Sequence, residues 1–162
     1  MPPTRYLGAE HQAYAIIRRR LVIRKASAVW QGSLREGKGT MSVESGCLRD
    51  AQYSFSSRFE ESAGTNPEEM IGAAHAGCFS MALSGQLTTA GTPPDRVTTA
   101  ASVTIEKTDA GFTVTAIHLD VRAKVPGADA ESFQGAADRA LRTCPVSRLL
   151  NTSITMKARL EP

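Results

Sequence analysis

Two of the three cysteines in this 162-residue sequence lie where thiol chemistry can be considered. Cys78 is part of the stretch "AAHAGCFSMAL" (73–83), which consists almost entirely of small and apolar residues. A free cysteine in an apolar helix is more often an inert core residue than a nucleophile, because buried cysteine behaves as a small hydrophobe. Cys78 alone therefore does not establish a reactive site.

Cys144 has a more suggestive setting, because it directly precedes Pro145 in "CPVSRLL" (144–150). Proline suits the first position of a helix, which makes Cys144 the expected N-cap. A thiol there faces unpaired backbone N–H groups and the positive end of the helix dipole, and both favour the thiolate. The 66-residue spacing between the two cysteines is not a motif. From the residues alone, the pair is a candidate redox dithiol.

The helix that would carry Cys78 has clear boundaries. Asn66 can cap it, Pro67 suits its first position, and Glu69 stands where a capping box places an acid. We expect the helix to continue to about Ala90, where glycine and proline follow. Its interior is rich in glycine and alanine and has no wide polar face. We therefore expect it to be buried on all sides, in part by a partner subunit.

The remaining segments alternate between hairpins and helices. Strands are expected over 25–34 and 38–48, 53–59, 97–108 and 112–124, and 152–161, with helices over 129–144 and 145–150. The order βββ-α-ββ-α-β has no parallel βαβ rhythm, so it predicts an α+β fold with an antiparallel sheet around a buried central helix. We expect one domain over 24–162, preceded by an N-terminal extension over 1–23.

The two cysteine motifs resemble those of a known family. "TNPEEMIGAAHAGCFSMALS" (65–84) and "CPVSRLL" (144–150) are similar to the motifs of the osmotically inducible protein C (OsmC) family, which includes the organic hydroperoxide resistance (Ohr) proteins. The upstream stretches "AVWQGSLREGKGTMSVESG" (28–46) and "FSSRFE" (55–60) resemble the OsmC branch in particular. The resemblance covers about 24–162, with both motifs in order.

The resemblance implies a cysteine-based peroxidase for organic hydroperoxides that works as an intertwined homodimer without metal, haem or flavin. Cys78 would attack the peroxide, and Cys144 would resolve the resulting sulfenic acid as an intramolecular disulfide. Arg58 and Glu68 would accompany the thiolate. The family's reductants are lipoylated proteins or small dithiols, so the implied partners are a hydroperoxide, such a reductant and a second copy of the chain.

The implied chemistry requires a cation, because a thiol with a pKa of about 8.5 is only a few per cent thiolate at neutral pH. Arg58 could favour the Cys78 thiolate, and Glu68 could hold the guanidinium as a bidentate pair. Arg35, in the first predicted hairpin, is a second candidate cation. Without the resemblance, Arg58 would be interpreted as a surface arginine and Glu68 as an acid that favours a helix N-terminus.

The spacing of Glu68 and Cys78 raises a geometric problem. Ten residues of continuous helix would separate them by about 15 Å along the axis. Either the helix breaks near Gly72 or Gly77, or the dimer partner supplies Arg58. We expect the second arrangement, with sites composed of both subunits.

Other interpretations stay open from the residues alone. His75 and Cys78 could ligate a metal, but no further ligands are evident. A small-molecule-binding protein, or a general thiol-disulfide protein without peroxidase turnover, is the alternative function, although no C-x-x-C occurs. Cys47 is interpreted as a structural residue in a strand. An apolar mouth for bulky hydroperoxides could be lined by Met70, Phe79, Met81 and Phe133.

Charge and composition argue against several classes of protein. Residues 1–25 carry a net charge of +5, whereas residues 26–162 carry 13 basic and 15 acidic side chains, a net charge of −2. The body of the chain therefore lacks the basic face of a nucleic-acid-binding protein. No apolar run is long enough for a membrane span. An odd number of cysteines and the absence of a secretory signal pattern predict a cytoplasmic protein.

Overall fold

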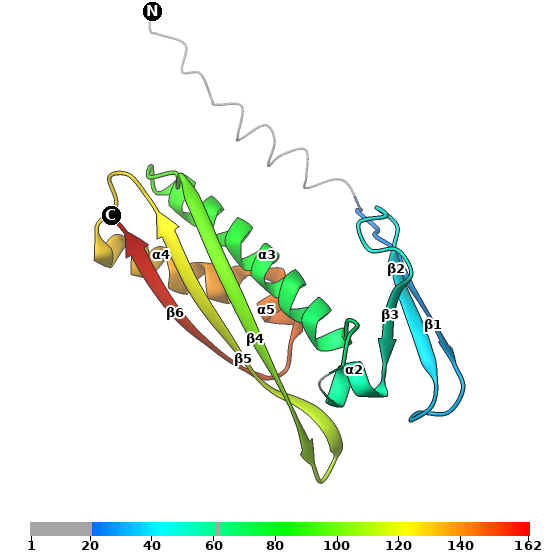
Figure 1. Ribbon diagram of the computed structural model, residues 1–162. Helices are drawn as coiled ribbons and strands as arrows, with labels where there is room; N and C mark the ends of the chain where they lie inside the picture. The colour runs from blue at the N-terminus through cyan, green and yellow to red at the C-terminus, as the bar shows by residue number, and fades with distance from the viewer. Residues whose placement is uncertain (1–20, 61) are drawn as a thin grey trace, which may run out of the picture.

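Two three-stranded sheets and their helices make up the fold in a computed structural model, which describes residues 21–60 and 62–162 (Figure 1). The first sheet contains β1 (Ala26–Gln31), β2 (Lys38–Val43) and β3 (Ala51–Ser54), in the order β1-β2-β3. The second contains β4 (Arg96–Thr108), β5 (Gly111–Lys124) and β6 (Ser153–Glu161), in the order β4-β5-β6. The α+β class is confirmed, and residues 1–20 of the expected extension lie outside the described chain.

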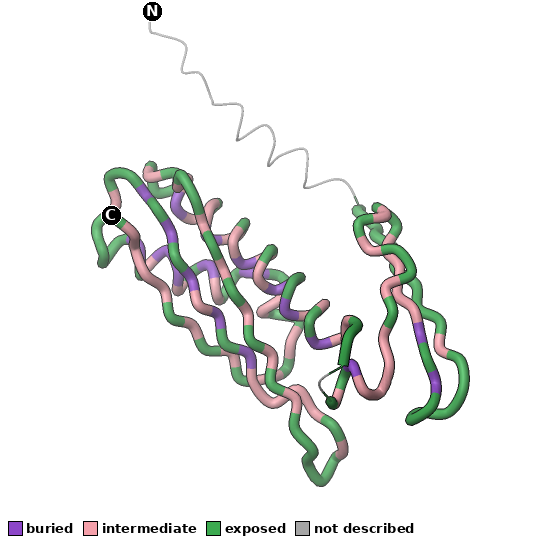
Figure 2. The backbone as a smooth tube through the Cα atoms, viewed as in Figure 1, coloured by how far each residue is buried: buried purple, intermediate pink, exposed green. Residues whose placement is uncertain are grey.

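The core lies between the second sheet and the helices α3 (Pro67–Thr89), α4 (Ala130–Thr143) and α5 (Pro145–Leu149). Strand β5 occupies the middle of this sheet and contributes Ile117, Leu119 and Val121, which are fully buried. Period-two alternation places these three side chains on the face that packs against the helices. Buried positions follow β5 and one face of α3 and of α4 in Figure 2.

The central helix begins and ends close to its predicted boundaries. The Asn66 side chain accepts a hydrogen bond from the backbone N–H of Glu69 at 2.8 Å, and the helix runs from Pro67 to Thr89. It is not buried on all sides within the single chain. One face is buried, whereas Met81 on the other is 79% exposed. Apart from the helix's own backbone, no atom of the described residues lies within 4 Å of a Cβ added at Gly77. The described residues leave this face of the helix open.

The predicted third strand over 53–59 was wrong after Ser54. Strand β3 ends at Ser54, and the helix α2 (Phe55–Phe59) follows. The Ser54 hydroxyl accepts a hydrogen bond from the Ser57 backbone N–H, and the Ser57 hydroxyl accepts one from the Ser54 backbone N–H. This reciprocal cap satisfies free N–H groups at the helix start, which explains why the alternation of aromatic and polar residues did not extend the strand.

Two other expectations need correction. Strand β2 ends at Val43, so Cys47 lies in an exposed turn and not in a strand; positive φ angles at Gly46 and Asp50 accompany the reversal of the chain. The sheet is also not wholly antiparallel, because β6 pairs parallel with β5. The two helices between β5 and β6 carry the chain back to the opposite end of the sheet, and such a crossover permits parallel pairing.

Candidate active site

The two cysteines of the predicted pair are brought together in the fold. Their Sγ atoms are 3.2 Å apart, close enough for a hydrogen bond between the thiols. Cys78 lies in the middle of α3 and is partly exposed, whereas Cys144 is fully buried at the junction of α4 and α5. Helix α3 packs against both α4 and α5, and this packing joins two positions that are distant in the sequence.

Cys144 occupies the N-cap position of α5, as predicted. The Cys144 side chain makes no capping hydrogen bond to α5 in the structure. Burial raises the pKa of Cys144, but the donors around it lower the pKa by more: the backbone N–H of Ser147, the thiol of Cys78, the hydroxyl of Ser147 and the backbone N–H of Val146. The pKa of Cys144 therefore lies below its ordinary value. The donors at the start of α5 favour the thiolate of this residue.

The pKa of Cys78, in contrast, lies above its ordinary value within the single chain. Burial raises the pKa of its thiol, and the neighbouring Cys144 raises it further, whereas a hydrogen bond from the backbone N–H of Val146 acts in the other direction. The net direction is upward, so Cys78 is mainly a neutral thiol near pH 7. A cation near Cys78 would be needed to reverse this direction.

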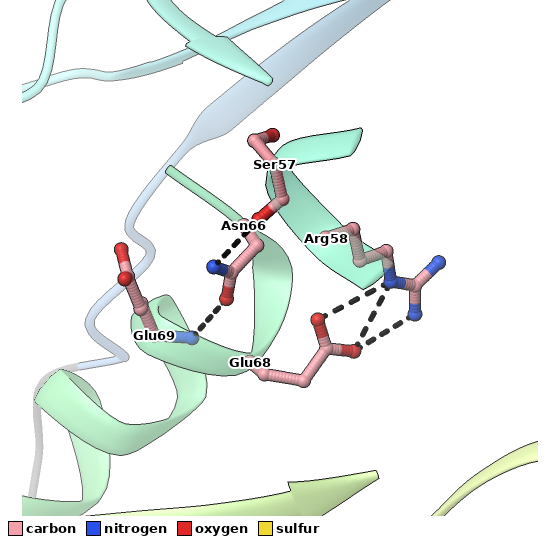
Figure 3. A network of polar contacts seen from close by, with 5 residues as sticks. All are labelled: Ser57, Arg58, Asn66, Glu68 and Glu69. Carbon is pink, nitrogen blue, oxygen red and sulfur yellow. Dashed lines mark hydrogen bonds and ion pairs between the residues drawn. The ribbon is translucent and has the colours of Figure 1, made fainter. Parts of the chain in front are cut away.

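Arg58 and Glu68 form a close ion pair at the start of α3 (Figure 3). The Arg58 guanidinium donates from Nη2 to Glu68 Oε1 at 2.8 Å and from Nε to Oε2 at 3.2 Å, so the two planar groups engage side by side. Glu68 is 8% exposed, and the ion pair gives this buried carboxylate a partner. Arg58 keeps about a third of its side chain exposed and available to another molecule.

Asn66 fixes the short helix of Arg58 against the start of α3. Its side-chain oxygen caps α3, and its Nδ2 donates to the Ser57 backbone carbonyl at 3.3 Å (Figure 3). The Ser57 hydroxyl also donates to the Thr65 carbonyl at 2.9 Å, across the loop between the two helices. These contacts hold Arg58 beside Glu68.

The structure thus gathers the four predicted site residues into two groups. Cys78 and Cys144 form one group, and Arg58 and Glu68 form the other at the N-terminal end of α3. Because α3 is continuous from Pro67 to Thr89, the two groups are separated by about 15 Å along its axis. A break near Gly72 or Gly77 is excluded.

Arg35, the second candidate cation, lies in the hairpin between β1 and β2 and stacks on Phe55, 5.4 Å from the ring centroid. Arg58 lies 5.0 Å from the centroid of Phe59. The rings of Phe55, Phe59 and Phe112 contact one another in series, so both arginines border a single aromatic cluster. Both therefore remain candidates for the cation.

His75 forms a contact that sequence reasoning missed. Its Nε2 lies 2.8 Å from the Ser147 hydroxyl, and the ring is fully buried. The sequence suggested only a metal ligand, but the described chain contains no cluster of three or more potential ligands. The available signal was the spacing of His75 with Gly72, Phe79 and Leu83, which places a polar ring on the buried stripe of the helix.

Comparison with known proteins agrees with the resemblance in the motifs. The family described as "OsmC-like protein" matches residues 59–159. The proteins named peroxiredoxin OsmC from Escherichia coli (strain K12) and from Shigella flexneri are each 49% identical over 138 residues, which is 85% of this chain and 96% of theirs.

Solved structures with low sequence identity share the fold. The organic hydroperoxide resistance protein OhrB of Bacillus subtilis matches with a TM-score of 0.60 at 22% identity, over 85% of this chain and 98% of that one. An OsmC-like protein of unknown function from Vibrio cholerae matches with a TM-score of 0.68 at 15% identity, over 86% and 100%. No helix in the described residues is long and apolar enough to cross a membrane. Because the family model matches residues 59–159 and the curated relatives are 49% identical, the chain belongs to the OsmC-like family.

Proposed function

We propose that this protein is a thiol-dependent peroxidase that reduces organic hydroperoxides to alcohols through Cys78 and Cys144. The 49% identity to the peroxiredoxin OsmC proteins makes it a cysteine-based peroxidase by class. The observation that supports the two-cysteine cycle is the 3.2 Å separation of the Sγ atoms. A disulfide has an S–S bond of about 2.05 Å, so its formation requires only a small approach of the two side chains.

In the proposed cycle, the Cys78 thiolate attacks the terminal oxygen of the hydroperoxide, the O–O bond breaks, and the alkoxide takes a proton to leave as the alcohol. Cys78 becomes a sulfenic acid. Cys144 then attacks Cys78 Sγ, which forms the disulfide and releases water. A small dithiol or a lipoylated protein supplies two electrons and two protons to restore both thiols.

The cation for the first step comes from the other subunit of a homodimer. Cys78 has a raised pKa within its own chain, and the Arg58 guanidinium of that chain is held by Glu68 near the far end of a continuous helix. Two features support dimerisation: the uncovered face of α3, and the first sheet, which extends away from the main core (Figure 1). Val29 and Leu34, in that sheet and its turn, are more than half exposed.

The proposed substrates are bulky hydroperoxides, because apolar surface lies close to both groups. Met81 is 79% exposed on the face of α3 that carries Cys78, and Phe112 is 54% exposed beside the arginines. Phe79 and Phe133, which were expected to line an apolar mouth, belong to the core of the single chain, so that expectation was wrong for these two. Burying each methylene of a substrate would contribute about 0.8 kcal/mol.

One experiment tests the proposal directly. The reduced protein is mixed with one equivalent of cumene hydroperoxide, and the products are quenched and separated by mass spectrometry. We expect stoichiometric conversion to the Cys78–Cys144 disulfide with release of cumyl alcohol. If the peroxide is not consumed, or if both thiols remain reduced, peroxidase function is refuted. Stress defence in the cytoplasm is the proposed setting, because a cycle through free thiols needs a reducing compartment.

A further inference from the structure

Phe112 connects the second sheet to the helix that carries Arg58. It is the second residue of β5, directly after the turn of the β4–β5 hairpin, which reaches past the start of α3 (Figure 1). The centroid of its ring lies 4.3 Å from that of Phe59 in α2, although more than half of the residue is exposed. A scattered exposed apolar side chain is ordinary, but two rings this close across two elements form a specific contact.

Phe59 extends this contact to Arg58. The Arg58 Cζ atom lies 5.0 Å from the centroid of the Phe59 ring, within the range of a cation–π contact. The Phe59 ring also contacts the ring of Phe55 at 4.9 Å, so it has two aromatic neighbours. Removal of the Phe112 ring would leave one of these neighbours and would open space for other rotamers of Phe59.

The Glu68 carboxylate constrains a different part of the Arg58 guanidinium. It accepts hydrogen bonds from Nε at 3.2 Å and from Nη2 at 2.8 Å, which fixes one edge of the planar group (Figure 3). The hydrogen bonds of the described chain leave the third nitrogen, Nη1, as a donor for another molecule. Because the ion pair holds the edge and the Phe59 ring lies against the guanidinium, the two contacts together determine where Nη1 is directed.

We propose that Phe112 is a positioning residue for Arg58: it fixes the Phe59 ring and thereby the direction in which the guanidinium is presented to the thiol of the other subunit. The proposal rests on the proposed peroxidase function, because it concerns the attack on the peroxide. In that step the bond between Cys78 Sγ and oxygen forms, and the O–O bond breaks with both electrons on the leaving oxygen. The leaving oxygen takes up the proton that the Cys78 thiol released.

The strength of the contact between the two rings sets the expected effect. The pKa of Cys78 is raised within its own chain, so the fraction of thiolate depends on the cation. An aromatic pair contributes enough free energy to change a population roughly two- to tenfold. We therefore expect Phe112→Ala to slow oxidation of Cys78 by a factor in that range near pH 7. The midpoint of the pH profile should rise by about 0.3 to 1 unit, toward that of Arg58→Ala.

The test measures this pH profile in single turnover with two peroxides. Reduced full-length protein is mixed rapidly with one equivalent of hydrogen peroxide or cumene hydroperoxide, and total oxidised Cys78 is followed by quenched-flow mass spectrometry. Hydrogen peroxide has no apolar group to contact the Phe112 ring, so slowing with this substrate isolates the positioning role. Phe112→Ala should raise the midpoint with both peroxides. Slowing confined to cumene hydroperoxide would assign Phe112 to substrate binding alone and would refute the proposal.

Further variants separate positioning from a general packing defect. Phe112→Tyr keeps the ring and should retain the wild-type profile. Thr113→Ala is the matched control, because it removes hydroxyl contacts of the same hairpin, to Thr108 at 3.0 Å and to Gly111 at 3.2 Å. It should leave the profile unchanged, and a shift equal to that of Phe112→Ala would refute the proposal. Phe112→Ala should also add nothing to the effect of Arg58→Ala, and further slowing in the double variant would contradict a role through Arg58.

Mixed dimers identify the chain in which the ring acts. In a heterodimer of Cys78→Ser and Arg58→Ala, the single intact site takes its arginine from the Cys78→Ser chain. Phe112→Ala in that chain should slow the site, whereas the same change in the Arg58→Ala chain should not. Equal slowing from both placements would show that Phe112 does not act through the arginine of its own chain.

The outcomes are distinguishable from failure of the proposed function. If wild-type protein forms neither sulfenic acid nor disulfide, the peroxidase proposal fails, and the role of Phe112 fails with it. If wild type oxidises Cys78 and Phe112→Ala has the wild-type pH profile, the positioning role is refuted while the peroxidase function stands. Phe112→Leu, which keeps apolar bulk without a ring, carries the same prediction if Phe112→Ala fails to fold.

Discussion

The composite site makes a quantitative prediction for mixed dimers. Cys78→Ser removes the attacking thiol, and Arg58→Ala removes the proposed cation, so homodimers of either variant should be inactive or nearly so. A shift of one pKa unit changes the ratio of thiolate to thiol tenfold, so loss of the cation should slow peroxide attack at least tenfold. In a heterodimer, one site would combine the intact Cys78 of one chain with the intact Arg58 of the other.

The activity expected of the heterodimer follows from the separation between the Arg58–Glu68 pair and Cys78. Glu68 holds Arg58 by a 2.8 Å contact about 15 Å from Cys78 along an unbroken helix, so the pair within one chain cannot serve its own thiol. One of two symmetry-related sites is then intact in the heterodimer, and purified heterodimer should show about half of the wild-type turnover per dimer. The assay is steady-state reduction of cumene hydroperoxide by dimers isolated through two different affinity tags.

A matched pair of variants provides the control. Cys78 and Cys144 lie 3.2 Å apart in one chain, so a heterodimer of Cys78→Ser and Cys144→Ser has no complete thiol pair and should recover no disulfide cycle. The mixture of Cys78→Ser and Arg58→Ala should therefore gain activity, and the mixture of Cys78→Ser and Cys144→Ser should not. If the mixture of Cys78→Ser and Arg58→Ala shows no recovery in verified heterodimers, Arg58 does not act across the interface.

The other predictions concern single variants and conditions. Cys78→Ser should abolish turnover, whereas Cys144→Ser should complete one attack and accumulate Cys78 sulfenic acid, detectable with dimedone; unchanged turnover in Cys78→Ser would refute the mechanism. Cys47→Ser should keep near wild-type activity, because Cys47 lies in an exposed turn, and a large loss would assign it the resolving role. Cumene hydroperoxide should show a higher kcat/KM than hydrogen peroxide, and equal values would contradict the apolar mouth. Burial lowers the pKa of His75 from 6.5, so the residue binds a proton more readily in the unfolded state. Its contribution to the free energy of unfolding is therefore present above pH 6.5 and falls as the pH drops below that value. Urea titrations at several pH values should show a shallower decline of the free energy of unfolding for His75→Gln than for wild type, and identical declines would contradict this.

Local patterns were sufficient for helices α3, α4 and α5 and for the second hairpin, but not for α2. The cap at Asn66 and the prolines at the first position of both helices are local signals, so the starts of α3 and α5 were predicted correctly. The third strand was partly wrong because a Ser54–Ser57 cap competes locally with strand alternation, and both patterns occur in the same few residues. The parallel position of β6 was missed because pairing across two helices depends on where the chain returns.

For the candidate site too, some features could be predicted from the sequence and others depend on tertiary packing. Residue type and motif resemblance were sufficient to indicate Cys78, Cys144, Arg58 and Glu68, because thiols and a bidentate arginine pair have recognisable chemistry. Which of them meet depends on packing: the 66-residue gap between the cysteines is closed by helices α3, α4 and α5, and spacing in the sequence does not encode that contact in any local pattern. The continuity of α3 and the link from His75 to Ser147 also arise from long-range packing, since each requires elements far apart in the chain to lie together.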